Sequence, residues 1–259
     1  MKVITLVENY TCQKGITAQH GLSLYIETNS KKILFDMGQN ELFEKNAMSL
    51  NVDISSVDVA ILSHGHYDHG GGAMHFLNMN KTSPLYINKN SFCDFFSKNG
   101  YIGLNKELSS NPRVVQTECK TEIYPFATLY MGEDVSQKEK SFSGGLKKSV
   151  GNVIVDDDFI HEQYLLIEEN GKRILFSGCS HRGILNIIEC FKPDVFFGGF
   201  HLNSLGYESD ELRCVAEKLL KYNTVFYTCH CTGIESYSFL KTKLKANLNY
   251  LNSGKCVEI

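Results

Sequence analysis

The sequence lacks the features that mark several large classes of protein. The chain has 26 lysines and arginines and 29 aspartates and glutamates, so its formal net charge is −3. It therefore has no excess of positive charge that would attract nucleic acid or an anionic membrane. No apolar run approaches the ~20 residues of a membrane span. The N-terminal segment lacks the anatomy of a signal peptide. We therefore expect a cytoplasmic protein with a small-molecule substrate and no nucleic-acid or membrane partner, and homo-oligomer formation is left open.

Proline is scarce and the cysteines are not paired in motifs. The four prolines form no Pro-rich linker, and none of the nine cysteines belongs to a Cys-x-x-Cys pair. In a chain of this length without a secretion signal, such cysteines indicate reduced, mostly buried thiols. Cys179, and the pair Cys229 and Cys231 that flanks His230, are set apart because they lie in motif-like segments.

Apolar residues make up 42% of the 259 residues, enough for a sizeable core. This length permits one large domain or two small ones. An insertion or lid is expected within 97–151, where regular patterns are weakest; a plain connecting loop is the alternative. Strands are expected at 3–7, 22–27, 32–35, 57–62, 84–87, 113–115, 164–168, 173–176, 194–197 and 225–228, with Asn170-Gly171 as a hairpin turn, and helices at 40–50, from 73, and at 89–97, 183–191, 210–222 and 236–244.

The densest chemical signal is a histidine cluster that follows the apolar run 57–62. Here His64, His66, Asp68 and His69 fall within six residues, and three glycines come next. Imidazole nitrogens and a carboxylate oxygen that converge form a site for a borderline divalent metal, with Zn²⁺ favoured over Mn²⁺ or Fe²⁺. The alternative is a polar loop whose histidines face solvent. The position after a buried strand favours the metal site.

Three further histidines occupy equivalent places in the second half. His181, His201 and His230 each follow a predicted strand and lie near a glycine. Any one of them alone could be a core histidine. Taken with the first cluster, they indicate a shared site.

These segments carry a family resemblance. Asp36 in Phe-Asp-Met-Gly, the His64-x-His66-x-Asp68-His69 loop and His230 after a late strand resemble the metallo-β-lactamase superfamily. The segments Gly-Cys-Ser-His-Arg-Gly from 178, Gly-Gly-Phe-His-Leu from 198 and His-Cys-Thr-Gly from 230 are similar to its branch labelled 7,8-dihydropterin-6-yl-methyl-4-(β-D-ribofuranosyl)aminobenzene 5′-phosphate synthase. The resemblance implies an α/β (α+β) fold, a four-layer αββα sandwich that forms one domain over residues 1–259.

The resemblance also implies a binuclear metal site. One metal would lie on His64, His66 and a later histidine, and the second on Asp68, His69 and His230. Asp36 would hold a ligand imidazole or order the loop. Cys179 stands where the family has a bridging aspartate, so we infer that His181 takes over as a ligand, with a Cys179 thiolate as the alternative and a one-metal site left open.

The implied chemistry is hydrolysis by a metal-activated water. Asp68 would orient the water and accept its proton, and His201, if it is not a ligand, would donate a proton to the leaving group or bind substrate. Arg182, at the start of helix 183–191, is a candidate phosphate ligand, with a solvent-exposed arginine as the alternative; His20 is a second substrate candidate.

The sequence therefore predicts a metal-dependent hydrolase-type enzyme acting on a small phosphorylated or heterocyclic metabolite. The pterin-synthase label would instead require a condensation with loss of pyrophosphate. Two other classes stay open: a di-iron redox protein that depends on a flavin partner, and a non-catalytic, metal-containing ligand-binding module.

Overall fold

The computed structural model describes residues 1–259, and the chain divides into two compact units. The first unit comprises residues 1–119, 145–157 and 252–259, and the second comprises 120–144 and 158–251. The chain crosses between the units at 119–120 and 144–145, so the segment 97–151 contributes to both. The candidate site residues are likewise divided, and each unit has its own sheet and core.

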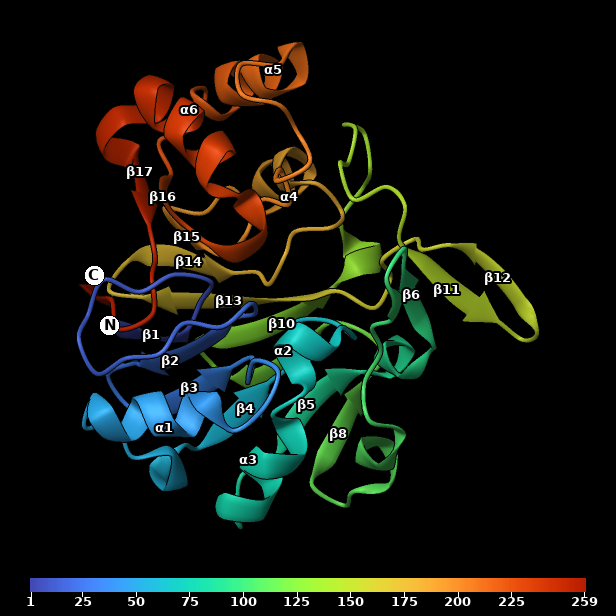
Figure 1. Ribbon diagram of the computed structural model, residues 1–259. Coiled ribbons are helices and arrows are strands. Elements are labelled where there is room, and N and C mark those ends of the chain that lie inside the picture. The colour runs from blue at the N-terminus through green and yellow to red at the C-terminus, as the bar shows by residue number, and fades with distance from the viewer. The chain divides into compact units, whose positions relative to one another are not determined.

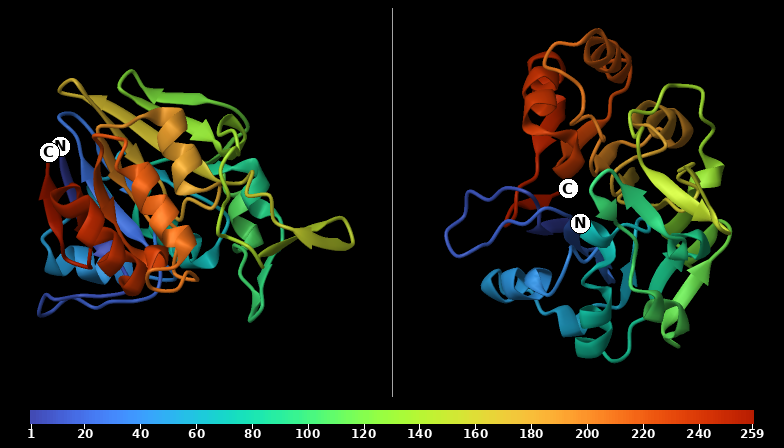
Figure 2. Two further views of the ribbon diagram at one scale, coloured as in Figure 1. Left: turned by 90° about the horizontal axis from the view of Figure 1, so that it is seen from above. Right: turned by 45° about the vertical axis from the view of Figure 1, so that its right-hand side comes forward.

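The first unit is built on a seven-stranded sheet. Its β1, β2, β3 and β18 pair antiparallel, whereas β3, β4, β5 and β8 run parallel. Because β18 pairs with β1, the two chain ends lie side by side, and the Met1 amino group donates to the Ile259 carbonyl at 3.1 Å (Figure 2). The spatial order is β18 (Cys256–Glu258), β1 (Lys2–Val7), β2 (Ser23–Glu27), β3 (Lys32–Phe35), β4 (Val59–Ile61), β5 (Leu85–Asn88) and β8 (Val114–Thr117).

Two helices cover one face of this sheet (Figure 1). Phe43 and Ala47 of α1 and Phe76 of α3 pack in one buried cluster with Leu34 and Ala60 of the sheet. The helices are α1 (Leu42–Ser49), α2 (Tyr67–Gly70) and α3 (Ala73–Met79), with 3₁₀ turns at Ile54–Ser56, Lys89–Phe92 and Lys106–Ser110.

A four-stranded sheet completes the first unit and corrects one prediction. The helix expected at 89–97 is wrong: a 3₁₀ turn, Lys89–Phe92, is followed by strand β6. Residues 95 and 96 pair with 148 and 147, some fifty positions later, and this distant partner overrides the local pattern. The spatial order is β12 (Val153–Asp156), β11 (Lys147–Val150), β6 (Phe95–Ser97) and β7 (Gly100–Tyr101).

The second unit has a seven-stranded sheet of its own. Strands β14 to β17 are parallel and the others antiparallel. The predicted hairpin is confirmed: Asn170 and Gly171, both at positive φ, join β13 to β14. The spatial order is β17 (Leu248–Tyr250), β16 (Val225–Thr228), β15 (Val195–Phe197), β14 (Lys172–Phe176), β13 (Gln163–Glu169), β10 (Ala127–Met131) and β9 (Thr121–Tyr124).

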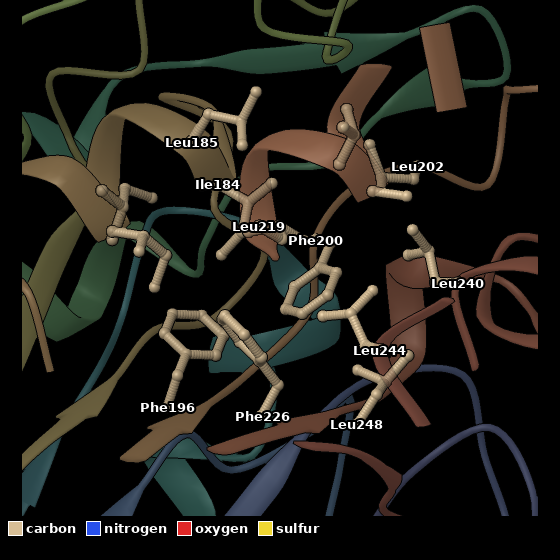
Figure 3. Close-up of a cluster of buried hydrophobic side chains, with 14 of the residues drawn as sticks. Ile184, Leu185, Phe196, Phe200, Leu202, Leu219, Phe226, Leu240, Leu244 and Leu248 are labelled. Atoms are coloured by element: carbon tan, nitrogen blue, oxygen red, sulfur yellow. The ribbon is translucent and has the colours of Figure 1, made fainter. Parts of the chain in front are cut away.

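The core of the second unit lies between this sheet and three helices. Leu175, Phe196, Phe226 and Leu248 are successive partners in the strand register, so their side chains form one apolar row across four strands. Helix residues pack against that row (Figure 3). The helices are α4 (Ile184–Phe191), α5 (Asp210–Leu219) and α6 (Ile234–Leu244), with 3₁₀ turns at Gly132–Asp134, His230–Thr232 and Lys245–Asn247.

None of the helices could cross a bilayer, since the longest, α6, has 11 residues.

Candidate metal centre

The histidine cluster of the first unit lies directly beyond β4. His64 and His66 occupy the turn after this strand, and His69 lies on the short helix α2. All three rings are at most 4% exposed. The ring centroid of His64 is 4.5 Å from that of His66 and 4.2 Å from that of His69. The three imidazoles thus gather in a buried group, and the alternative of a solvent-facing polar loop is ruled out.

Asp36 orients this cluster from the end of β3, the parallel neighbour of β4. Its Oδ2 lies 2.6 Å from His69 Nδ1, and its two oxygens accept the Ser63 N–H at 2.7 Å and the Ser63 hydroxyl at 2.8 Å. Ser63 Oγ also lies 2.8 Å from His64 Nδ1. A carboxylate only accepts, so His69 Nδ1 carries the proton and Nε2 is the nitrogen that can coordinate a metal.

The loop that carries Asp36 is held in an unusual conformation. Asp36 has φ 60°, which few residues other than glycine adopt. The Ser23 hydroxyl donates to the Asp36 carbonyl at 2.8 Å, and Met37 N donates to His69 O at 2.7 Å. This backbone pairing between the two loops places the carboxylate against the histidine ring.

The glycines after the cluster, Gly70 to Gly72, allow the two loops to approach each other closely. Substitution of Gly71 tests this. A Cβ at Gly71 would lie 2.2 Å from the carbonyl oxygen of Gln39 and 2.6 Å from that of Tyr67, both backbone atoms. We expect Gly71→Ala to lower the free energy of unfolding by about 1–3 kcal/mol, the usual cost of overpacking, in urea titrations. Gly206→Ala, where a Cβ meets open space, is the control. Equal stability of the two variants would contradict the tight packing.

Asp68 and His20 also meet in the first unit. His20 Nε2 lies 3.1 Å from Asp68 Oδ2, with the Asp68 side chain 13% exposed and that of His20 56% exposed. The imidazole therefore restrains the carboxylate at the edge of the cluster, and an exposed histidine is placed where it can reach a ligand in solution.

In the second unit, three strand ends meet at one sheet edge. Because β14, β15 and β16 are adjacent and parallel, the segments that follow them come together. The segment after β14 carries Cys179 and His181, the segment after β15 carries His201, and the segment after β16 carries His230 and Cys231. The ring centroids of His181 and His201 are 4.3 Å apart. Burial raises the pKa of the Cys231 thiol, but hydrogen bonds with Cys179 and His201 and the charges of nearby imidazoles outweigh burial and hold this pKa well below its usual value.

Glu162, to which the sequence assigned no role, positions His181. Its fully buried carboxylate accepts the backbone N–H of His181 at 2.6 Å, that of Arg182 at 3.0 Å and the Tyr164 hydroxyl at 2.6 Å. Burial raises the pKa of this carboxyl, although the three hydrogen bonds lower it in part. The His181 ring stacks on Phe159 with centroids 4.6 Å apart. The ring is therefore fixed in place.

The guanidinium of Arg182 is hydrogen-bonded to neighbouring loops of the second unit. Its Nη1 donates to the Asp158 carbonyl at 2.8 Å and its Nη2 to the Val135 carbonyl at 2.9 Å. The side chain of Asn186, in the first turn of α4, accepts the N–H groups of residues 138 and 139 at 2.9 and 2.8 Å. The guanidinium thus already binds this unit's own backbone, and the Asn186 side chain ties residues 138 and 139 to the first turn of α4.

The donors present fit a divalent metal. The first unit supplies three buried imidazoles and a carboxylate, and at least one of the imidazoles is held through Nδ1 by a carboxylate, as in zinc sites. The second unit supplies imidazoles and thiols, and the buried His201 Nδ1 has no hydrogen-bond partner. Buried polar groups normally bind something, and a metal suits these residues.

Comparison with known proteins identifies the family. Residues 16–90 match the family model described as the metallo-beta-lactamase superfamily. The 7,8-dihydropterin-6-methyl-4-(beta-D-ribofuranosyl)-aminobenzene-5'-phosphate synthase of Methanocaldococcus jannaschii is 31% identical to the chain and covers 100% of it, with 96% of the relative aligned. This chain belongs to the metallo-beta-lactamase superfamily.

Two further proteins are similar to this chain over its whole length. An uncharacterized protein of the same archaeon is 30% identical over 98% of both chains. The crystal structure of a metal-dependent hydrolase of the beta-lactamase superfamily, Tm1679, matches with a TM-score of 0.86 and 26% identity over 100% of this chain and 99% of its own. The predicted fold class of this superfamily member is confirmed.

Proposed function

We propose that this superfamily member is a metal-dependent enzyme of the hydrolase type that acts on a small phosphorylated or heterocyclic metabolite. The hydrogen bond from His69 to Asp36 carries the proposal, since a buried carboxylate that fixes a histidine tautomer is typical of metal centres. The proposed ligands are His64, His66, Asp68 and His69 in the first unit and His181 and His230 in the second, with Cys179 as the alternative to His181.

A divalent metal would supply a nucleophilic water near neutral pH and polarise the electrophile. The chain's own residues then have distinct tasks. Asp68, restrained by His20, would orient the attacking water and accept its proton. His201, which is partly exposed, would donate a proton to the leaving group or bind substrate if it is not itself a ligand. Ser63 would keep the imidazole of His64, and Asp36 that of His69, in the tautomer that ligates.

Turnover by metal-loaded protein tests this proposal. We expect protein with two equivalents of Zn²⁺ or Mn²⁺ to hydrolyse members of phosphodiester, lactone and thioester panels, and His66→Ala to lose at least 100-fold in kcat/KM, about 2.7 kcal/mol. The matched control is His75→Ala, because His75 lies in the same unit but pairs with Glu44 at 2.5 Å, outside the cluster. Equal turnover by the His66 variant and wild type would overturn the proposal.

The full-length similarity to the pterin synthase favours one second function. Such a condensation would bond an aromatic carbon or amine to a pterin methylene group as the bond from that methylene group to pyrophosphate breaks and the carbon or amine loses a proton, and the metals would hold the phosphates. Pyrophosphate release from a dihydropterin methyl diphosphate in the presence of a ribofuranosylaminobenzene phosphate, with no turnover in the hydrolysis panels, would establish the synthase. Iron absorption bands in the purified protein would favour the redox alternative, and metal binding without any turnover would favour a binding module.

A further inference from the structure

Two thiols and an imidazole, all from the second unit, lie close together. The Sγ atoms of Cys179 and Cys231 and a ring nitrogen of His201 are all within 4.8 Å of one another. Cys179 is 3% exposed and Cys231 is 4% exposed. We call these three residues the thiolate triad. Since all three lie after adjacent strands of one sheet, their proximity is fixed within this unit.

The backbone is shaped to bring the triad together. Gly199 N donates to the Gly178 carbonyl at 2.8 Å, and Leu202 N donates to the Cys231 carbonyl at 3.1 Å. A Cβ at Gly199 would lie 2.3 Å from Cys231 Sγ, so only glycine leaves room for the sulfur there. These contacts link all three strand-end segments around the two thiols.

The conformation and hydrogen bonding of His201 are unusual at this position. Its backbone has φ 50°, a costly conformation for a residue that is not glycine. Its Nδ1 is buried and has no hydrogen-bond partner in the chain. Burying such a nitrogen without a partner costs about 1–3 kcal/mol, so the position of this ring beside the two thiols is not explained by the ring's own hydrogen bonds.

We propose that Cys179, His201 and Cys231 form a thiolate-imidazole metal site that selects Zn²⁺ over Mn²⁺ and Mg²⁺. Thiolates are soft ligands that prefer zinc, and a tetrahedral zinc with S–Zn bonds of about 2.3 Å accommodates donors at this spacing. Binding of Zn²⁺ forms two Zn–S bonds and releases the two thiol protons to solvent. The inference rests on the proposed function only in that the chain binds a divalent metal.

Cobalt substitution tests the site on the full chain. We expect the wild-type protein loaded with Co²⁺ to show a near-ultraviolet charge-transfer band from thiolate to cobalt, and Cys231→Ser to lose about half of its intensity because one of two sulfur ligands is removed. Cys229→Ser, at a buried cysteine two residues away, should keep the full band. An unchanged band in Cys231→Ser, or no band in the wild type, would overturn the proposal.

Zinc K-edge X-ray absorption of the wild type gives a test that depends on no variant. With one equivalent of zinc we expect a shell of two sulfur atoms at about 2.3 Å, which Mn²⁺ in tenfold excess does not displace. A shell with one sulfur, as Cys179 alone would give, or with nitrogen and oxygen alone, would overturn the thiolate triad while leaving the hydrolase proposal intact. Conversely, a two-sulfur shell in a protein that turns over no substrate would support the triad and count against the hydrolase.

Discussion

Asp36→Ala is expected to lower the affinity of the chain for Zn²⁺ by about 10- to 100-fold, the usual cost of removing a carboxylate that holds a ligating histidine. The carboxylate is completely buried and binds His69 Nδ1 together with the N–H and hydroxyl of Ser63. Truncation leaves these donors without their acceptor, so the free energy of unfolding should also fall, by about 3 kcal/mol. Competition with a chelating dye and urea titration measure the two effects.

Asp36→Asn should separate the two effects. When the asparagine oxygen accepts the Ser63 N–H, its NH₂ group faces His69 Nδ1 and makes that nitrogen an acceptor. The proton then sits on Nε2, which can no longer coordinate. We expect a loss of zinc affinity comparable to that of Asp36→Ala with less than half of its loss in stability.

The matched control for both variants is Asp58→Asn. Asp58 lies in the same unit and also accepts a backbone N–H, that of Lys32 at 2.8 Å. Its side chain forms an ion pair with Lys31 and none with a histidine of the cluster. Zinc affinity should be unchanged in this variant. If Asp36→Asn binds zinc as tightly as Asp58→Asn does, the carboxylate does not set the tautomer of His69.

Local patterns in the sequence are sufficient to predict where the strands end and which histidines follow them. The cluster from His64 to His69 could be placed because its residues are adjacent in the chain and follow an apolar strand. Ser63 and Glu162 could not be identified, since their partners, Asp36 and the 181–182 backbone, lie 27 and about 20 positions away. Those contacts depend on which strands become neighbours, and periodicity does not encode that pairing.

The same limit explains the error at 89–97 and why the contacts of Arg182 could not be predicted. An apolar, aromatic segment such as Phe95-Phe96 satisfies helix and strand patterns equally over a few residues, and the pairing with residues 147–148 decides between them. An arginine beside a helix start suggests a phosphate ligand. Its carbonyl partners at Val135 and Asp158 are visible only once the loops are in place.

Glu162→Ala is expected to be among the most destabilising single substitutions in the second unit. It leaves the backbone N–H groups of His181 and Arg182 and the hydroxyl of Tyr164 buried without an acceptor. At about 1–3 kcal/mol for each unsatisfied donor, the free energy of unfolding should fall by about 3 kcal/mol or more. Tyr164→Phe removes one donor and keeps the carboxylate, so it should cost only about 1 kcal/mol. Urea titration at constant pH measures each variant.

Glu168→Ala is the control on β13, the strand that begins directly after Glu162, because this glutamate is exposed and pairs with Arg173 only at the surface. Exposed pairs of this kind contribute about 0–1 kcal/mol, so this variant should resemble the wild type. Since Glu162 also fixes the backbone of His181, Glu162→Gln, which retains one acceptor oxygen, should fold but bind zinc more weakly than Glu168→Ala. Full zinc affinity in Glu162→Gln would mean that the carboxylate stabilises the unit without positioning His181 for a metal.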